Sequence, residues 1–166
     1  MERVVVLGRG GAGKSTFSRR LGDATGLPVV ELDKIYWGSD LRALSAEEWV
    51  ERQGRVVVEP SWILDGDLGP YDVTAPRLER ADTVVILDTH LLRCVVRALR
   101  RGARRRDFWA WTLRWGSVSR PRLIADVRRY APGADLVLLG TPREVSRWLH
   151  EVRRLADTLT TDEAIR

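Results

Sequence analysis

One eight-residue segment constrains this chain more than any other: Gly8–Ser15, which reads GRGGAGKS. It follows the β-branched run Arg3–Leu7, which predicts a buried strand. It precedes Lys14–Leu21, which predicts a short helix stopped by Gly22. A G-x-x-x-x-G-K-[ST] pattern between a strand and a helix predicts a phosphate-binding loop (P-loop).

The residue types of this loop suit a triphosphate. Glycines let backbone amides point at phosphate oxygens, and the helix N-terminus adds partial positive charge. We expect Lys14 to reach the β- and γ-phosphates as a catalytic group and Ser15 to bind Mg²⁺. The alternative is a glycine-rich turn with an incidental lysine, but Lys14 is one of only two lysines in the chain. The predicted nucleotide-binding residues are Gly8, Gly10, Gly11, Ala12, Gly13, Lys14, Ser15 and Thr16.

Size and composition exclude several classes of protein. With 166 residues and 44% apolar residues, the chain is expected to form a single globular domain. Cys94 is its only cysteine, so an intrachain disulfide and a cysteine zinc site are excluded. The two histidines argue against a histidine-built metal site. The apolar run at the N-terminus is too short for a signal peptide or a membrane span, so we expect no membrane partner and a cytoplasmic protein.

Positive charge is concentrated in residues 93–122. This segment holds ten arginines and one acid, Asp107, for a local charge of +9. Since the whole chain carries +5, the remaining residues sum to −4. Such a basic block indicates a phosphate-bearing partner, either a nucleotide or a nucleic acid.

Strand and helix patterns alternate along the chain. Short apolar runs predict strands at residues 3–7, 28–32, 62–64, 83–87 and 135–139. Capping boxes predict helix starts at Ser45–Glu48 and Thr141–Glu144. Val56–Val58 fits either the end of a helix or a strand. The alternation predicts an α/β fold with a mainly parallel sheet covered on both faces.

Three helices are predicted between the last two strands. The first has an apolar stripe opposite a stripe of arginines, which predicts that the apolar stripe packs on the core. An aromatic helix with Phe108, Trp109, Trp111 and Trp115 follows, then a helix with Leu123, Ile124, Val127 and Tyr130. The apolar stripe of the first helix consists of Leu91, Leu92, Val95, Val96 and Leu99.

Together with the P-loop, an ordered set of further motifs resembles the adenylate-kinase-like "topology modulation" group of P-loop kinases. The motifs are Leu27–Asp33, Tyr36-Trp37, Ser61–Asp67, Ala81–Asp88 and Thr141–Val145, and the resemblance extends to about residue 150. It implies a three-layer P-loop nucleoside-kinase-like fold with a five-stranded parallel sheet, ATP and Mg²⁺. The core would be residues 1–92 and 132–166, with a helical arginine-rich lid at about 93–131. The group's usual Asp-Gly-Asn-Tyr is here Asp65-Gly66-Asp67-Leu68, which adds a carboxylate.

Three aspartates follow predicted strands. The resemblance places Asp65 where an aspartate holds magnesium waters; the alternative is an Asp-Gly turn. Asp33 lies on the side where ligands bind in open α/β sheets, so it would accept a hydroxyl proton or orient an acceptor. Its alternative is a helix N-cap. Asp88 is expected to cap the arginine helix.

Arginines and a later loop complete the expected site. Arg97, Arg101 and Arg104 share one helical face, and the resemblance implies that they grip the transferring phosphate, with Arg97 also binding nucleotide. The alternative is a solvated face, but five arginines without i, i+4 acids repel one another and favour an anionic partner. Thr141, Pro142 and Arg143 resemble the loop that flanks adenine, or else simply a well-capped helix. The tryptophans are expected to pack in the core or the lid.

These features favour an ATP- and Mg²⁺-dependent phosphotransferase with a small-molecule or nucleotide acceptor. Two other functions remain open: a nucleic-acid-binding regulator whose basic block sits on a phosphate backbone, and a switch that hydrolyses ATP slowly. The sequence leaves open the acceptor, ATP or GTP as donor, and the oligomeric state.

Overall fold

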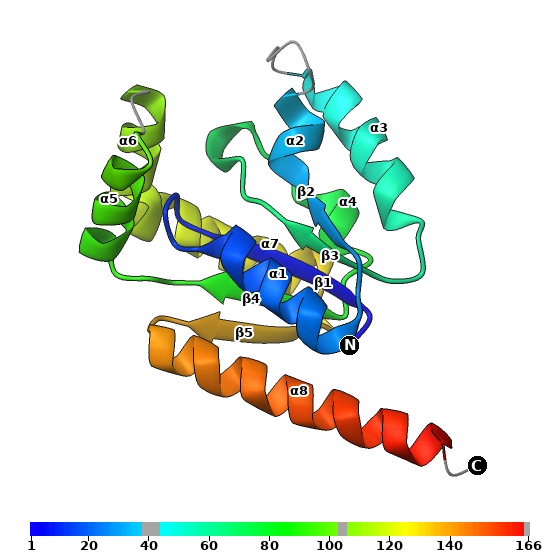
Figure 1. Cartoon of the computed structure of the whole chain (residues 1–166). Coiled ribbons are helices and arrows are strands. Elements are labelled where there is room, and N and C mark those ends of the chain that lie inside the picture. The colour runs from blue at the N-terminus through cyan, green and yellow to red at the C-terminus, as the bar shows by residue number, and fades with distance from the viewer. Residues whose placement is uncertain (38–43, 103–105, 165–166) are drawn as a thin grey trace.

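A five-stranded sheet with strand order β2-β3-β1-β4-β5 forms the centre of the molecule (Figure 1). The computed structural model describes residues 1–37, 44–102 and 106–164. All four strand pairs are parallel. The sequence-based prediction of an α/β fold with five parallel strands is therefore confirmed. The strands are β1 Arg3–Gly8, β2 Val29–Glu31, β3 Trp62–Asp65, β4 Thr83–Leu87 and β5 Asp135–Leu139.

Helices cover both faces of the sheet and make three layers. One face carries α1 (Lys14–Thr25) and α8 (Pro142–Ala164). The other carries α3 (Ala46–Val57), α4 (Ala75–Leu78) and α7 (Arg120–Tyr130). The remaining elements are α2 Leu32–Trp37, η1 Gly69–Tyr71, α5 Leu91–Arg100, α6 Arg106–Arg114 and the π-helical turn η2 Trp115–Ser119.

The central strand β1 supplies both halves of the core. Val4 and Val6 pack with the α1 and α8 layer, whereas Val5 and Leu7 pack with the α3, α4 and α7 layer. All four side chains are fully buried. A strand buried on both faces reads as a continuous apolar run, which is why this strand is predictable from sequence.

Helix starts follow the predicted caps. The Ser45 hydroxyl accepts a hydrogen bond from the Glu48 amide at 3.2 Å, and the Glu48 carboxylate accepts one from the Ser45 amide at 2.9 Å. Thr141 and Glu144 make the same pair of bonds at the start of α8. The helix that begins after Ser45 continues to Val57, so residues 56 and 57 are helical rather than a strand.

The predicted end of the first helix is wrong. The helix α1 passes through Gly22 and ends at Thr25, with Gly26 as its C-cap. A Cβ on Gly22 would lie 2.8 Å from Cγ2 of Val29. The glycine is therefore needed for close packing of the helix against β2, which begins at Val29, and not as a stop signal.

The buried face of α5 also differs from the predicted one. Its buried residues are Cys94 and Ala98, whereas the large apolar residues of the predicted stripe are half-buried or exposed. A Cβ on Gly11 would lie 2.4 Å from the carbonyl oxygen of Cys94. The P-loop approaches so closely that only small side chains fit on this face. The exposed members of the stripe are Leu92 (67%), Val96 (46%) and Leu99 (61%).

The predicted aromatic helix forms as α6, except that Trp115 lies in the π-helical turn η2 that follows it, and the next predicted helix forms as α7. Trp115 is fully buried, and Leu123 and Val127 of α7 belong to the core on one face of the sheet. Figure 1 shows α5 and α6 at the end of the sheet where the loop between β1 and α1 lies. None of the helices in the described part of the chain is long and apolar enough to cross a membrane.

Candidate functional site

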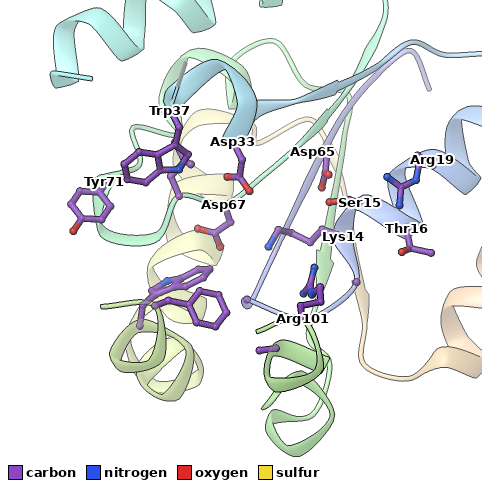
Figure 2. A pocket seen from close by; sticks show the side chains of 17 residues that line it. Lys14, Ser15, Thr16, Arg19, Asp33, Trp37, Asp65, Asp67, Tyr71 and Arg101 are labelled. Carbon is purple, nitrogen blue, oxygen red and sulfur yellow. The ribbon is translucent and has the colours of Figure 1, made fainter. Parts of the chain in front are cut away.

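Several loops converge at the carboxyl edge of the sheet. The P-loop follows β1, the helix α2 follows β2, and Asp65 ends β3. Together with α5 and α6 they enclose a cavity of about 540 Å³ (Figure 2). Its wall includes four of the predicted site residues from the sheet edge, Lys14, Ser15, Asp33 and Asp65.

Lys14 faces this cavity from the start of α1. Its Nζ donates to the carbonyl oxygen of Gly8 at 2.8 Å and to that of Arg9 at 3.4 Å. It also lies 5.9 Å from the centre of the Trp111 ring. The residue before it, Gly13, has φ +100°, a conformation that a residue with a side chain rarely adopts. The glycine thus turns the chain so that the lysine reaches the cavity.

Asp65 combines deep burial with an unused oxygen. Its side chain is 3% exposed, and its Oδ1 has no hydrogen-bond partner among the described residues. Desolvation raises the pKa of this carboxyl, while the hydroxyl of Ser15 and the charge of Lys14 lower it. A buried carboxylate oxygen beside a hydroxyl suits a magnesium ion that takes its other ligands from phosphate and water. The described residues contain no group of three or more acidic, histidine or cysteine side chains that would form a metal cage by themselves.

Asp33, from α2, also lines this cavity. The helix α2 begins at Leu32, so Asp33 is in its first turn and not at the N-cap. Although the side chain is exposed, desolvation by the surrounding protein raises its pKa, Lys14 lowers it, and Asp65 and Asp67 raise it further. The carboxyl therefore holds its proton to higher pH than an ordinary aspartate.

Asp67 is a site residue for which the sequence had suggested no role. It is 6% exposed and lines the cavity. Its Oδ1 accepts a hydrogen bond from the Gly69 amide at 2.9 Å, and its Oδ2 accepts one from Nε1 of Trp115 at 3.3 Å. Desolvation raises its pKa, and Lys14 lowers it. The only signal in the sequence was the additional carboxylate two residues after Asp65.

Arg9 is a second residue that sequence reasoning missed. Although it occupies a variable position of the P-loop motif, its side chain is buried. The guanidinium lies 5.2 Å from the centre of the Trp115 ring. Trp115 therefore contacts both the P-loop arginine and Asp67, so a single buried ring joins the loop to the carboxylate.

Two of the three predicted lid arginines lie beside the P-loop. Arg97 donates from Nη1 to the carbonyl oxygen of Ala12 at 2.9 Å. Arg101 lies in the cavity wall with Phe108 and Trp111 of α6. Arg104 lies outside the described residues. The arginine face of α5 is thus turned partly toward the loop rather than wholly to solvent.

A second cavity of about 490 Å³ lies on the other side of the P-loop. Thr16, Arg20, Arg97 and Pro142 are in its wall. Thr141 uses its hydroxyl to accept from the Glu144 amide, and Arg143 is exposed. Of the predicted adenine-flanking loop, only Pro142 is among the described lining residues.

Asp88 does not cap the arginine helix. The N-cap position of α5 is His90, without a side-chain hydrogen bond. The Asp88 carboxylate instead accepts from Nε of Arg120 at 2.7 Å. This ion pair joins two residues that are 32 positions apart, so no local pattern revealed it.

Aromatic side chains form much of the remaining wall of the first cavity. Trp37 comes from α2, Tyr71 from η1, and Phe108 and Trp111 from α6. The prediction that the tryptophans serve packing holds for Trp115, which is fully buried. Trp111 is only half-buried and lies in the wall of the cavity.

Comparison with known proteins identifies the fold. No protein family and no curated protein matches the sequence. Among solved structures, a shikimate kinase from Acinetobacter baumannii in complex with shikimate has a TM-score of 0.57 at 16% identity, covering 95% of this chain and 94% of its own. A gluconokinase from Sinorhizobium meliloti has a TM-score of 0.55 at 18% identity, covering 97% of each chain. A sugar kinase from Janibacter has a TM-score of 0.51 at 20% identity, covering 90% of this chain and 93% of its own. The chain therefore has the fold of small P-loop kinases.

Proposed function

We propose that this protein is an ATP-dependent phosphotransferase that acts on a small-molecule or nucleotide acceptor. One observation carries the proposal: Lys14, Asp33, Asp65 and Arg101 line a single cavity at the carboxyl edge of the sheet. A phosphoryl-transfer site needs these parts, namely a lysine on the phosphates, a carboxylate for the metal, a base for the acceptor and a cation for developing charge. The shared fold with small-molecule kinases supports the same function.

In our proposal, each of the two cavities beside the P-loop binds a different substrate. The nucleoside occupies the cavity of about 490 Å³ next to Pro142, with Thr141 and Arg143 flanking it. The triphosphate lies along the loop amides of residues 8–16. Arg97 binds it from α5, within a lid that extends over about residues 93–131. The acceptor occupies the cavity of about 540 Å³ beyond Lys14.

Ser15 and Asp65 are the residues that would hold Mg²⁺. Asp65 already has an oxygen that accepts no hydrogen bond from the described residues, and the Ser15 hydroxyl lies beside this carboxylate. When bound, the ion would neutralise part of the negative charge of the phosphates.

The reaction follows from the positions of the side chains. The acceptor oxygen forms a bond to the γ-phosphorus as the bond from that phosphorus to the β–γ bridging oxygen breaks. Asp33 receives the proton of the acceptor hydroxyl, and ADP departs. Lys14 and Arg101 stabilise the charge that develops on the transferring group. Because both cations are positioned before the reaction, little reorganisation is needed.

The resemblance to the "topology modulation" group of adenylate-kinase-like proteins agrees with this assignment, and we propose membership of that group. Its motifs Leu27–Asp33 and Ser61–Asp67 contain the three carboxylates of the cavity. A nucleic-acid-binding role for the basic block is the alternative function.

The decisive experiment is a transfer assay with γ-labelled ATP against a panel of nucleosides, nucleotides, sugars and small alcohols. We expect label in an acceptor product that requires Mg²⁺ and is lost in Lys14→Ala. A protein that binds neither ATP nor its non-hydrolysable analogue would contradict the proposed function.

A further inference from the structure

The half of the first cavity beyond Lys14 is built from carboxylates and aromatic rings. Figure 2 shows Asp33 and Asp67 on this side, near Trp37 and Tyr71. The two carboxylates are close enough for the charge of Asp67 to raise the pKa of Asp33. The described cations that line the cavity come instead from α1 and from the C-terminal end of α5: Lys14, Arg19 and Arg101.

Lys14 is the counter-charge of these carboxylates while no nucleotide is bound. It lowers the pKa of Asp33, Asp65 and Asp67. A bound triphosphate attracts the same ammonium group, and Mg²⁺ would compensate Asp65. Asp33 and Asp67 then face the acceptor with less positive charge near them, and the buried carboxylate of Asp67 in particular favours a cation beside it.

Asp67 retains the capacity to bind such a cation. Each of its oxygens accepts one hydrogen bond from the protein, from the Gly69 amide and from Trp115. A carboxylate oxygen has about two acceptor positions, so each keeps one for a ligand. The two protein bonds hold the buried carboxylate in place at the cavity wall.

Two independent observations point to a cationic ligand. The ring of Trp111 already has the ammonium group of Lys14 at 5.9 Å from its centre, so this wall accepts positive charge on an aromatic face. The Asp67 carboxylate, which is 6% exposed and lines the same cavity, also forms no ion pair with any of the described residues. An acceptor with a carboxylate or phosphate would instead place a further negative charge beside Asp67.

We propose that the acceptor carries a protonated amine next to the hydroxyl that is phosphorylated, as in an amino alcohol or amino sugar, and that Asp67 binds this amine. The proposal rests on the proposed phosphotransferase function. Asp33 receives the hydroxyl proton, and Asp67 selects the acceptor by its charge. The aromatic side chains enclose the amine and exclude water from it.

The test uses acceptors that differ only in one charged group. Glucosamine, glucose and glucuronate form one matched series, and ethanolamine, ethylene glycol and glycolate form another. With labelled ATP, we expect kcat/KM for the amine to exceed that for the neutral alcohol roughly 10- to 100-fold, the usual range for a hydrogen bond to a charged group. The carboxylate member should be the poorest acceptor of each series.

Variants assign the preference to Asp67. In Asp67→Asn the preference for the amine should fall by most of that factor, while affinity for ATP changes less than about twofold. Asp135→Asn is the matched control: this carboxylate is exposed at the start of β5, at the opposite edge of the sheet, and its loss should leave the preference unchanged. The acceptor series on the unmodified protein tests the proposal even if Asp67→Asn does not fold.

A binding measurement completes the test without turnover. With a non-hydrolysable ATP analogue bound, the amine should raise the thermal unfolding midpoint more than its neutral counterpart, and Asp67→Asn should abolish the difference. Equal effects of amine and neutral alcohol, or better transfer to the carboxylate, would overturn the amine proposal while leaving a kinase. Failure to bind ATP would overturn the proposed function itself.

Discussion

A buried ion pair supports the loop that carries Asp67 and Tyr71, and its removal yields the most quantitative prediction. Asp72 accepts hydrogen bonds from Nη2 of Arg77 at 2.5 Å and from the Leu68 amide at 3.1 Å. It also accepts from Nη1 of Arg77 at 3.0 Å and from the indole of Trp49 at 3.3 Å. Both members of the pair are buried. We therefore expect Arg77→Ala to destabilise the fold strongly.

The expected cost follows from what the substitution leaves behind. Without the guanidinium, Asp72 remains as a buried charge, and the Gln53 side-chain oxygen loses its 2.7 Å bond from Arg77. Removing one partner of a buried pair costs about 3–5 kcal/mol. A natural domain has only about 5–15 kcal/mol of stability, so a large part of it would be lost. Arg77→Lys keeps the charge but loses the paired geometry and should cost less.

Urea unfolding monitored by tryptophan fluorescence measures this cost. With a slope of about 2 kcal/mol per molar, the midpoint should fall by roughly 1.5–2.5 M. Arg55→Ala is the matched control, because Arg55 pairs with Glu51 at 2.6 Å but both side chains are mostly exposed. An exposed pair is worth at most about 1 kcal/mol. Equal midpoints for Arg77→Ala and Arg55→Ala would refute the reasoning.

Four predictions concern the site. Lys14→Ala should abolish Mg²⁺-dependent ATP use while the protein still folds, because the side chain faces a cavity and its loss leaves no void in the core, although the nearby carboxylates lose a counter-charge; unchanged ATP affinity by calorimetry together with unchanged turnover would contradict this. Asp65→Asn should weaken Mg²⁺ dependence and turnover more than nucleotide affinity, since it removes the anion that would hold the metal's waters. If this variant has wild-type turnover at every Mg²⁺ concentration, Asp65 serves only in the Asp-Gly turn. Desolvation raises the pKa of Asp33 above 3.8, and only the deprotonated carboxylate can accept the acceptor's proton, so kcat should rise with pH at a pH above 3.8. If kcat instead rises at or below pH 3.8, Asp33 is not the base. Arg101→Ala should lower turnover on the order of 10²–10³-fold with little effect on ATP binding, whereas intact turnover with a flatter salt dependence of nucleic-acid binding would favour the alternative function.

Local patterns predicted most of the secondary structure. The β4 and β5 strands have the bounds that their apolar runs indicated, and both capping boxes form as expected. These features depend on residues that are close in sequence, so a short segment contains the information. The same holds for the P-loop, where the positions of the glycines, Lys14 and Ser15 are a property of eight consecutive residues.

The predictions that were wrong rest on local patterns that more than one structural situation can produce. Gly22 was interpreted as a helix stop, but it allows the close approach of Val29. The large apolar residues of α5 predicted its buried face, but the space beside the P-loop admits only Cys94 and Ala98. In each case the deciding neighbour comes from another segment, which periodicity does not include.

The phosphate-binding loop, the alternation of strands and helices, and the aspartates that follow the strands can thus all be predicted from local sequence. Which of these side chains meet depends on the tertiary structure. The contact of Trp115 with both Arg9 and Asp67 joins segments about 50 and 100 residues apart along the chain, and no local pattern encodes it. The cavity exists because parallel strands bring their carboxyl ends to one edge, where α5 and α6 close over the loop. The protonation of these carboxyls also depends on the folded structure, since desolvation raises the pKa of Asp33, Asp65 and Asp67 only after the chain has packed around them.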